Sequence, residues 1–324
     1  MATYKGIQGY TVQKLSSDPP AAESIGQLWY NSGTGKFKIG TEGAGAWASG
    51  TAIPTATNAM GAAGTATAYL IWAGTASGIQ LTSYKYDGTT WTATNSLPSA
   101  ISGTSGTGTQ TAALGCGGYN GGYNNRTNEF DGTCWSTGNP GIGSAMGYKA
   151  INGTQTAALS IGGYGSPPPA QSAQCQEYDG TSWTAATAFP AARSEMYSAG
   201  TQTAAICTGG YPLTTTGFEY DGTSWAATNP TTTGRYSGNN GGTQTAAIIA
   251  GGEPYTGLTE KYDGTSWTEV GDLSTGRQTT AKGYQATSDA STSFIIAGGN
   301  APAKTTSVEV WTDPVVSIKT VTVS

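Results

Sequence analysis

Three of the four arginines recur at a fixed distance from a tryptophan. Each lies ten residues after it, and the three are Arg193, Arg235 and Arg277. Equivalent positions in a repeat would place their guanidinium groups on one face of the molecule. An arc of such groups could bind the carboxylate of an acidic sugar, because guanidinium matches carboxylate geometry. The alternative is that each arginine packs against a neighbouring repeat, and the sequence leaves both interpretations open.

No other residues have the spacing of a catalytic or metal site. The chain contains no His, which is the commonest general base and a frequent metal ligand. Five aspartates stand in one repeated position, which predicts that they cap backbone N–H groups in turns; they are Asp87, Asp131, Asp179, Asp221 and Asp263. Calcium binding by one such turn is the alternative. We therefore expect no enzyme activity, no metal and no cofactor.

Tyrosine and asparagine gather in the segments that vary most between repeats. These segments each follow a Gly–Gly pair, so we expect them on one face of the fold. Variable loops of this composition on a rigid scaffold commonly bind ligands. The expected contact residues, besides the three arginines, are Tyr119, Tyr123, Asn124, Arg126, Tyr164, Tyr211 and Tyr255. The alternative is sequence drift in unconstrained turns.

The elements that would position these residues are repeated. The string YDGTSW or a close relative occurs five times, and GTQTAA followed by Leu or Ile occurs four times. Tryptophans mark the period at intervals of 42 to 48 residues, at Trp47, Trp91, Trp135, Trp183, Trp225, Trp267 and Trp311. Within a unit, residues 156–161 alternate between two faces, as in a strand. Each unit is therefore expected to be an antiparallel sheet of about four strands, with tryptophan packing between sheets.

Composition excludes several classes of protein. Gly contributes 50 of 324 residues without a three-residue period, charged residues are only 10%, and the net charge is −5. These values argue against collagen, charge-driven disorder and long helices. The acidic balance gives no basic surface for nucleic acid, and no apolar stretch is long enough to insert in a membrane. The N-terminus has no apolar signal-peptide core, which predicts synthesis that ends in a cytoplasm.

Repeats of this length, with a Gly pair, an aromatic–Asp pair and a Trp in constant order, resemble kelch β-propellers. The resemblance covers roughly residues 45–313 and implies an all-β, kelch-like propeller. We favour seven blades over six, because residues 27–50 look like an incomplete seventh unit. The strand expected after Pro314 would pair with that N-terminal segment and close the ring. The expected domains are an extended anchoring arm at residues 1–25 and a propeller at residues 26–324.

A second resemblance concerns the N-terminal region. The run Gly26–Asn31, followed by Thr34–Lys38, is similar to a segment of tailed-bacteriophage virion proteins, often tail fibres. The repeat style is also similar to that of repetitive tail proteins of marine phages. The resemblance implies a non-enzymatic virion structural protein, assembled in the host cytoplasm and multimeric in the particle. Its arm would bind other virion proteins, and its loops a host surface glycan or protein. A capsid decoration protein and a cellular kelch-type adaptor are the alternatives.

Overall fold

The computed structural model describes residues 12–20, 23–42, 45–141, 143–165, 170–280, 293–313 and 316–322. The chain divides into two compact units: unit 1 consists of Met1–Ala46 and Asp313–Ser324, and unit 2 of Trp47–Thr312. Strands and no α-helix occur in these described ranges, which confirms the all-β expectation. Accordingly, none of the described segments is a helix that could cross a membrane.

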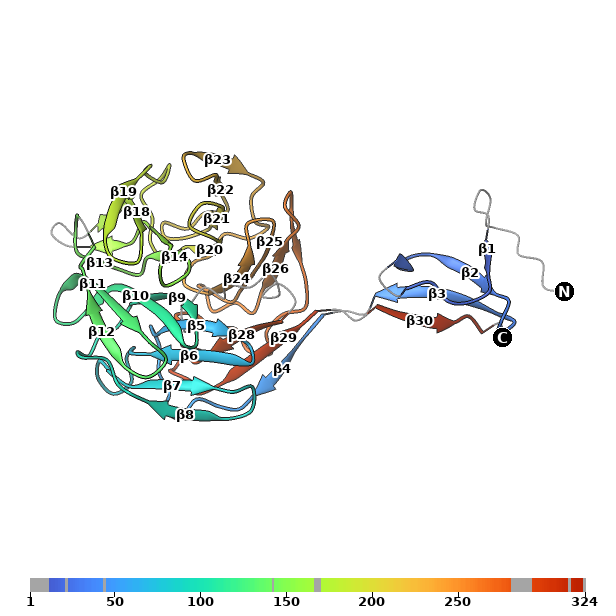
Figure 1. The fold of residues 1–324 in the computed structure, drawn as a ribbon, viewed down its shortest axis with the longest axis horizontal. Helices are drawn as coiled ribbons and strands as arrows, with labels where there is room; N and C mark the ends of the chain where they lie inside the picture. The colour runs from blue at the N-terminus through green and yellow to red at the C-terminus, as the bar shows by residue number, and fades with distance from the viewer. Residues whose placement is uncertain are drawn as a thin grey trace. The chain divides into compact units, whose positions relative to one another are not determined.

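Unit 2 contains six successive sheets arranged around a common centre (Figure 1). Sheets 1 to 5 are four-stranded and antiparallel, whereas sheet 6 has three described strands. Sheet 1 comprises β5 (Gly61–Thr65), β6 (Ala68–Trp72), β7 (Ser83–Tyr86) and β8 (Trp91–Thr94); sheet 2 comprises β9 (Ser105–Thr109), β10 (Ala112–Tyr119), β11 (Tyr123–Phe130) and β12 (Trp135–Gly138); sheet 3 comprises β14 (Ala150–Gly153), β15 (Ala158–Ile161), β18 (Cys175–Tyr178) and β19 (Trp183–Ala186). Sheet 4 comprises β20 (Tyr197–Gly200), β21 (Ala205–Thr208), β22 (Gly217–Tyr220) and β23 (Trp225–Thr228); sheet 5 comprises β24 (Asn239–Thr243), β25 (Ala246–Ala250), β26 (Thr259–Tyr262) and β27 (Trp267–Glu269); sheet 6 comprises β28 (Ser293–Ala297), β29 (Val308–Thr312) and β4 (Ala46–Gly50). A short sheet of β13 (Met146–Gly147), β16 (Tyr164–Gly165) and β17 (Ala170–Gln171) adjoins sheet 3 in the chain, and the whole arrangement agrees with a propeller-like fold.

Small residues in the first strand of a sheet make room for large side chains of the same sheet and of the neighbouring sheet. Trp72 of sheet 1 is 1% exposed and lies between two such glycines. A Cβ atom at Gly61 would come within 2.5 Å of the Trp72 ring, and one at Gly106 of sheet 2 within 2.3 Å. Neither position tolerates a side chain, so close packing within sheet 1 and between sheets 1 and 2 requires Gly at both.

The repeated glutamine of GTQTAA joins each of sheets 2 to 5 to the preceding sheet. Its Nε2 atom donates to two backbone carbonyls, one on the second strand of the preceding sheet and one at the end of the third, at 2.6–3.3 Å. The four residues are Gln110, Gln155, Gln202 and Gln244. Each glutamine thus donates to backbone carbonyl groups of the preceding sheet that would otherwise lack a hydrogen-bond donor.

Tyrosine and tryptophan side chains also donate hydrogen bonds to the preceding sheet. The hydroxyl groups of the turn tyrosines donate to a glutamate of the preceding sheet, in the pairs Tyr178–Glu129, Tyr220–Glu177 and Tyr262–Glu219. The indole N–H groups donate to a hydroxyl on the preceding third strand at 2.8–3.0 Å, in the pairs Trp135–Ser83, Trp183–Thr127 and Trp47–Thr259. The expectation that these tryptophans pack between sheets is confirmed for these three contacts.

Six residues, one for each sheet, form a closed cycle of backbone hydrogen bonds. Each N–H donates to the carbonyl of the equivalent residue of the sheet before it, at 2.6–2.9 Å. In chain order the ring residues are Ala59, Gly103, Tyr148, Glu195, Ser237 and Thr279, and Ala59 donates to Thr279. All six have a left-handed φ between 52° and 65°. The cycle links every sheet of unit 2 to both of its neighbours.

Unit 2 contains six described sheets where we favoured seven, and two tryptophans account for the difference. Trp47 on β4 and Trp311 on β29 belong to the same sheet, and their ring centroids are 5.7 Å apart. Trp311 lies on β29, opposite Phe294 of β28, where the equivalent strand of the other sheets has the turn aromatic. The indole that reaches the preceding sheet comes instead from Trp47. Seven tryptophans at regular intervals therefore mark six sheets.

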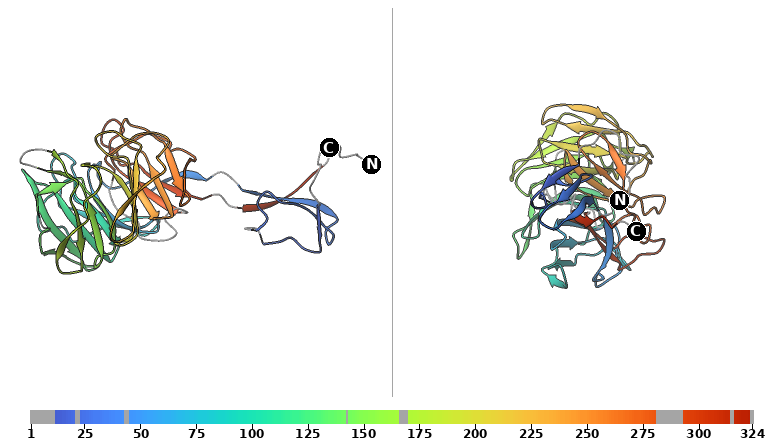
Figure 2. Two further views of the ribbon diagram at one scale, coloured as in Figure 1. Left: turned by 90° about the horizontal axis from the view of Figure 1, so that it is seen from above. Right: turned by 90° about the vertical axis from the view of Figure 1, so that its right-hand side faces the viewer.

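The remaining N-terminal and C-terminal strands form unit 1 (Figure 2). Its sheet has the order β1 (Gln13–Leu15), β2 (Leu28–Asn31), β3 (Lys36–Glu42) and β30 (Val316–Thr320). The expected pairing of the two chain ends is present as β3 with β30, but it lies in unit 1. The chain divides at residue 46, and not at residue 26 as we expected.

The anchoring arm predicted at residues 1–25 is not a separate extended segment where it is described. Gln13–Leu15 pairs in parallel with β2, and the Asp18 carboxylate accepts hydrogen bonds from the side chains of Trp29 and Asn31. These contacts hold the segment against the β2–β3 hairpin. Residues 1–11 of the arm lie outside the described residues.

The five repeated aspartates have the predicted turn role. In the turn after β22, Asp221 Oδ1 accepts the backbone N–H groups of Thr223 and Ser224 at 2.8 and 2.7 Å. Gly222 follows with a φ of 90°, which an L side chain rarely adopts. The other four turns repeat this arrangement, at Asp87, Asp131, Asp179 and Asp263.

Replacing Trp183 should destabilise unit 2 more than replacing Trp225. Trp183 is 5% exposed and bonds to Thr127, so Trp183→Ala should cost about 3–5 kcal/mol of unfolding free energy. Trp225, equivalent by sequence, is only half-buried and should lose less. Urea unfolding followed by far-ultraviolet circular dichroism would measure both. Equal losses would contradict the assignment of Trp183 as the tighter inter-sheet contact.

The turn aspartates should make unit 2 sensitive to acid. Hydrogen bonds from backbone N–H groups lower the pKa of Asp221 and Asp263. A carboxyl whose pKa is lower in the folded state stabilises the fold above its unfolded pKa of about 3.9, and loses that effect as pH falls through its folded pKa. Urea midpoints should therefore be constant between about pH 7 and 5 and decline below about pH 4. A protein carrying Asp221→Asn and Asp263→Asn should decline less steeply, and an unchanged decline would argue against these turns as the cause.

Candidate functional site

A pocket of about 460 Å³ is lined mainly by tyrosines of unit 2. Its lining residues are Tyr123, Tyr148, Tyr164, Gln171, Ser194, Glu195, Tyr211 and Tyr236. The volume is in the range of small-molecule sites. The pocket is therefore the candidate binding site.

Two kinds of repeated position supply most of the lining. One is the residue directly after the Gly pair, and the other is a ring residue or the residue before it. The two are joined by a β-bridge in each sheet, such as Ser194 with Tyr211 and Gly147 with Tyr164. The backbone frame is thus the same around the whole face, and the side chains that it presents differ from sheet to sheet.

The tyrosines occupy one part of this frame. At the equivalent positions of sheets 1 and 6 the side chains are polar: Asn58 and Thr75 form one bridge, and Gln278 and Asn300 another. Asn58 donates to Asn300 across the two sheets at 3.1 Å. In sheets 2 to 5 each bridge contains one tyrosine, in the pairs Ser102–Tyr119, Gly147–Tyr164, Ser194–Tyr211 and Tyr236–Glu253. The pocket lies on this part of the frame.

The tyrosines pack edge to face around the pocket. Ring centroids of Tyr123 and Tyr164 are 5.5 Å apart, and those of Tyr211 and Tyr236 are 5.4 Å apart. Burial and, to a lesser extent, the negative charge of Glu195 raise the pKa of Tyr148 to about 12. Burial also raises the pKa of Tyr123 and Tyr236. Their hydroxyl groups are therefore protonated at neutral pH and available as donors.

Only part of the expected contact set lines this pocket. Tyr123, Tyr164 and Tyr211 do so, and Tyr119 packs against Tyr123 at 5.3 Å between centroids without joining the lining. Asn124 accepts a hydrogen bond from the backbone of Arg126, and neither residue lines the pocket. Tyr255 is 41% exposed and also outside the lining.

Sequence reasoning missed Tyr148, Gln171, Ser194, Glu195 and Tyr236. A signal for Ser194, Glu195 and Tyr236 was present, because these residues directly follow the repeated Arg193 and Arg235. The residues that follow the repeated arginine differ from unit to unit, as the residues that follow the Gly pair do. Aligning the units on arginine would therefore have located the second half of the lining.

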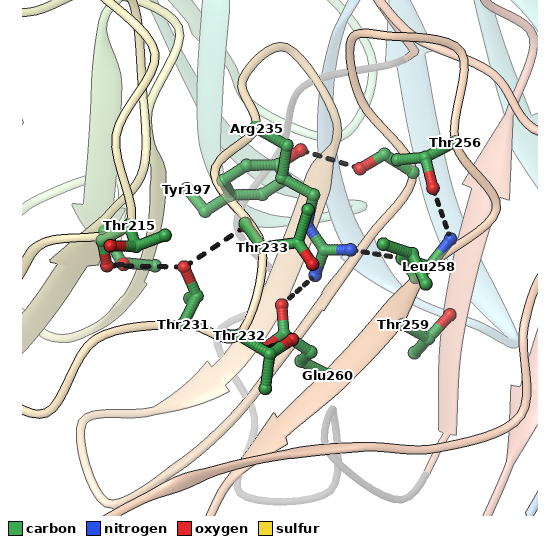
Figure 3. Close-up of polar contacts among 12 residues, drawn as sticks. Tyr197, Thr215, Thr231, Thr232, Thr233, Arg235, Thr256, Leu258, Thr259 and Glu260 are labelled. Carbon is green, nitrogen blue, oxygen red and sulfur yellow. Dashed lines mark hydrogen bonds and ion pairs between the residues drawn. The ribbon is translucent and has the colours of Figure 1, made fainter.

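The three arginines of the expected arc are buried and bonded within the fold, and Figure 3 shows Arg235 with its partners. Arg235 is 1% exposed, lies 2.7 Å from the carboxylate of Glu260 and donates to the carbonyl of Leu258 at 2.9 Å. Arg277 is likewise paired with Glu309 and donates to Ser307, although it contributes to the lining of a second hollow of about 210 Å³. Arg193, 8% exposed, donates to the carbonyl groups of Gly209 and Thr216. The structural interpretation fits these contacts, and the ligand-binding arc does not.

The pocket contains groups suited to binding more than to known acid–base arrangements. Glu195 is the one carboxylate in its lining, whereas glycoside hydrolysis usually needs two that face the scissile bond. Across the described ranges, no cluster of three or more His, Cys, Asp or Glu residues could hold a metal ion.

Removing Glu260 alone should be more damaging than removing the whole ion pair. Glu260→Ala leaves the buried Arg235 charge uncompensated, which should cost about 3–5 kcal/mol of unfolding free energy. Replacing both residues by Met removes the stranded charge, so the double variant should lose less. Urea denaturation of the three proteins would compare them. A double variant less stable than Glu260→Ala would contradict this account.

Comparisons with known proteins concern the fold. No protein-family model matches the chain, and no curated protein matches it. Among solved structures 272 chains match, including one described as the structure of YjhT. That structure is 15% identical, has a TM-score of 0.67, and the match covers 83% of this chain and 99% of that chain. At this identity the likeness shows that the two chains share a fold, and a shared fold alone does not assign a function.

Proposed function

We propose that unit 2 is a closed, kelch-like propeller of six blades, in which each described sheet is one blade. The closed cycle of six backbone hydrogen bonds supports both the closure and the number. The shared sheet of β4, β28 and β29 supports closure as well, because it joins the two ends of unit 2. Closure of this kind removes exposed sheet edges.

We further propose that the chain is a non-enzymatic binding protein that contacts a host surface glycan or protein through the tyrosine pocket. One observation carries this proposal: the backbone frame repeats around the whole face, and tyrosines are concentrated at its variable positions in sheets 2 to 5. Tyrosine supplies large contact area at low entropic cost, together with a hydroxyl group for hydrogen bonding.

The place of action follows from the sequence resemblance to tailed-phage proteins. We propose a virion protein of the tail fibre or tail tip, present in several copies. Unit 1 would anchor it to other virion proteins, since its sheet contains the phage-like segment of residues 26–38. A capsid decoration protein is the second candidate, and a cellular adaptor the third.

Phage particles carrying Tyr148→Ala should adsorb to host cells at least tenfold more slowly than wild-type particles. The variant should fold, because Ala59 occupies the equivalent ring position with nearly the same φ, 53° against 54°. Tyr255→Ala is the matched control, since Tyr255 is exposed and outside the pocket lining. Adsorption kinetics, with mass spectrometry of purified virions to count copies, would measure both properties.

Each failure has a distinct meaning. Absence of the chain from purified virions would overturn the proposed location. Normal adsorption by Tyr148→Ala particles would overturn the pocket as the contact site. Loss of incorporation would identify the loop face as an assembly surface and favour the decoration protein.

A further inference from the structure

Glu195 lines the pocket and, unlike five other glutamates of unit 2, has no bonding partner among the described residues. The Glu260 and Glu309 carboxylates are paired with arginines, and Glu129, Glu177 and Glu219 accept tyrosine hydroxyls. In the part of the chain that the structure describes, neither a hydrogen bond nor an ion pair reaches the half-buried Glu195 carboxylate. An unpaired carboxylate in a pocket is costly unless a ligand or water satisfies it.

A second carboxylate stands on the same face with an unsatisfied oxygen. Glu253 follows the Gly pair of sheet 5 and bridges to Tyr236, and its Oε2 atom is buried without a hydrogen-bond partner. Both carboxylates act on Tyr236, whose pKa is raised by burial and then by Glu253 and Glu195. The electrostatic potential at this side of the pocket is therefore negative.

No positive side chain offsets this potential within the pocket. The lining contains no Lys or Arg. Lys149, the neighbour of Tyr148 in sequence, is only 4% exposed and lies outside the lining. Tyrosine faces also attract cations through their ring quadrupoles. The pocket is thus complementary to a positively charged group.

The remaining lining groups favour a polyhydroxylated ligand over a plain alkyl chain. The Gln171 amide and several tyrosine hydroxyls can exchange hydrogen bonds with sugar hydroxyls, and tyrosine rings can pack against the C–H face of a sugar. A lysine side chain from a protein partner would leave most of these polar groups unused. The volume of about 460 Å³ also exceeds what a single extended side chain would fill.

We propose that the tyrosine pocket binds a protonated amino sugar, with its ammonium group beside Glu195 and its ring against the tyrosines. This proposal rests on the proposed function, since it names the chemical class of glycan that the pocket recognises. It also gives Glu195 a role at a ring position that elsewhere carries Ala, Gly, Ser or Thr, or the pocket residue Tyr148.

Two oligosaccharides of the same backbone separate charge from shape. The glucosamine trisaccharide is positively charged at neutral pH, and its N-acetylated counterpart is neutral. Isothermal titration calorimetry of the purified full chain should show at least tenfold tighter binding of the charged trisaccharide. Glu195→Gln should abolish this preference, because a charge-assisted hydrogen bond is replaced by a neutral one. Glu269→Gln, which removes an exposed charge outside the pocket, should preserve it.

Equal binding of the two trisaccharides, or an unchanged preference in Glu195→Gln, would overturn the proposal. Loss of both interactions in Tyr148→Ala would in that case leave the pocket as a binding site for neutral glycans, and the proposed function would stand. Trilysine binding as tightly as the charged trisaccharide would also overturn it, in favour of a basic protein partner. If Glu195→Gln failed to fold, the comparison of the two trisaccharides on the wild-type chain would still decide.

Discussion

Every sheet of unit 2 depends on the next one to complete its hydrogen bonding. The repeated glutamine, turn tyrosine and tryptophan all donate to the preceding sheet, as do the backbone N–H groups of the ring residues. Burying a backbone carbonyl without a donor is costly, so a sheet in isolation would be poorly satisfied. Because every sheet donates to the one before it, no sheet is left without a partner only if the first sheet donates to the last. The bond from Ala59 to Thr279 makes that connection.

The same constraint explains why the centre of the face can vary. A left-handed φ costs an L residue roughly 1–2 kcal/mol, yet five of the six ring residues are not glycine. The backbone bond of each ring residue does not involve its side chain, so the frame accepts Ala59 and Glu195 alike. The backbone atoms of the ring residues thus hold the sheets together, whereas their side chains can vary. A rigid frame with exchangeable side chains is the arrangement in which a binding site can change without loss of the fold.

The sequence was sufficient to predict antiparallel sheets of about four strands, the aspartate turns and the packing of tryptophans between sheets, because each rests on a residue that repeats. It was not sufficient to assign Trp311, which keeps the tryptophan interval but occupies the place of the turn tyrosine. The sequence also did not indicate which residues the arginines contact. Glu260 and Glu309 stand two residues before the aromatic at the end of the third strand, where sheet 4 has Phe218. Only the strand register shows that this position faces the arginine.

Some charged side chains of unit 2 are bonded within the fold, and others have no partner among the described residues. Buried arginines meet either a carboxylate, as Arg235 meets Glu260, or backbone carbonyls, as Arg193 does. The Nη atoms of Arg235 and Nη1 of Arg193 are bonded within the fold, although Arg235 Nε is buried without a partner among the described residues. A ligand would have to break existing bonds to reach these Nη atoms. Glu195 and Glu253 instead keep acceptor capacity that no described residue satisfies, beside tyrosines whose hydroxyls are protonated. Acceptor capacity that the fold leaves unused beside these tyrosines is therefore the physical basis for the proposed binding surface.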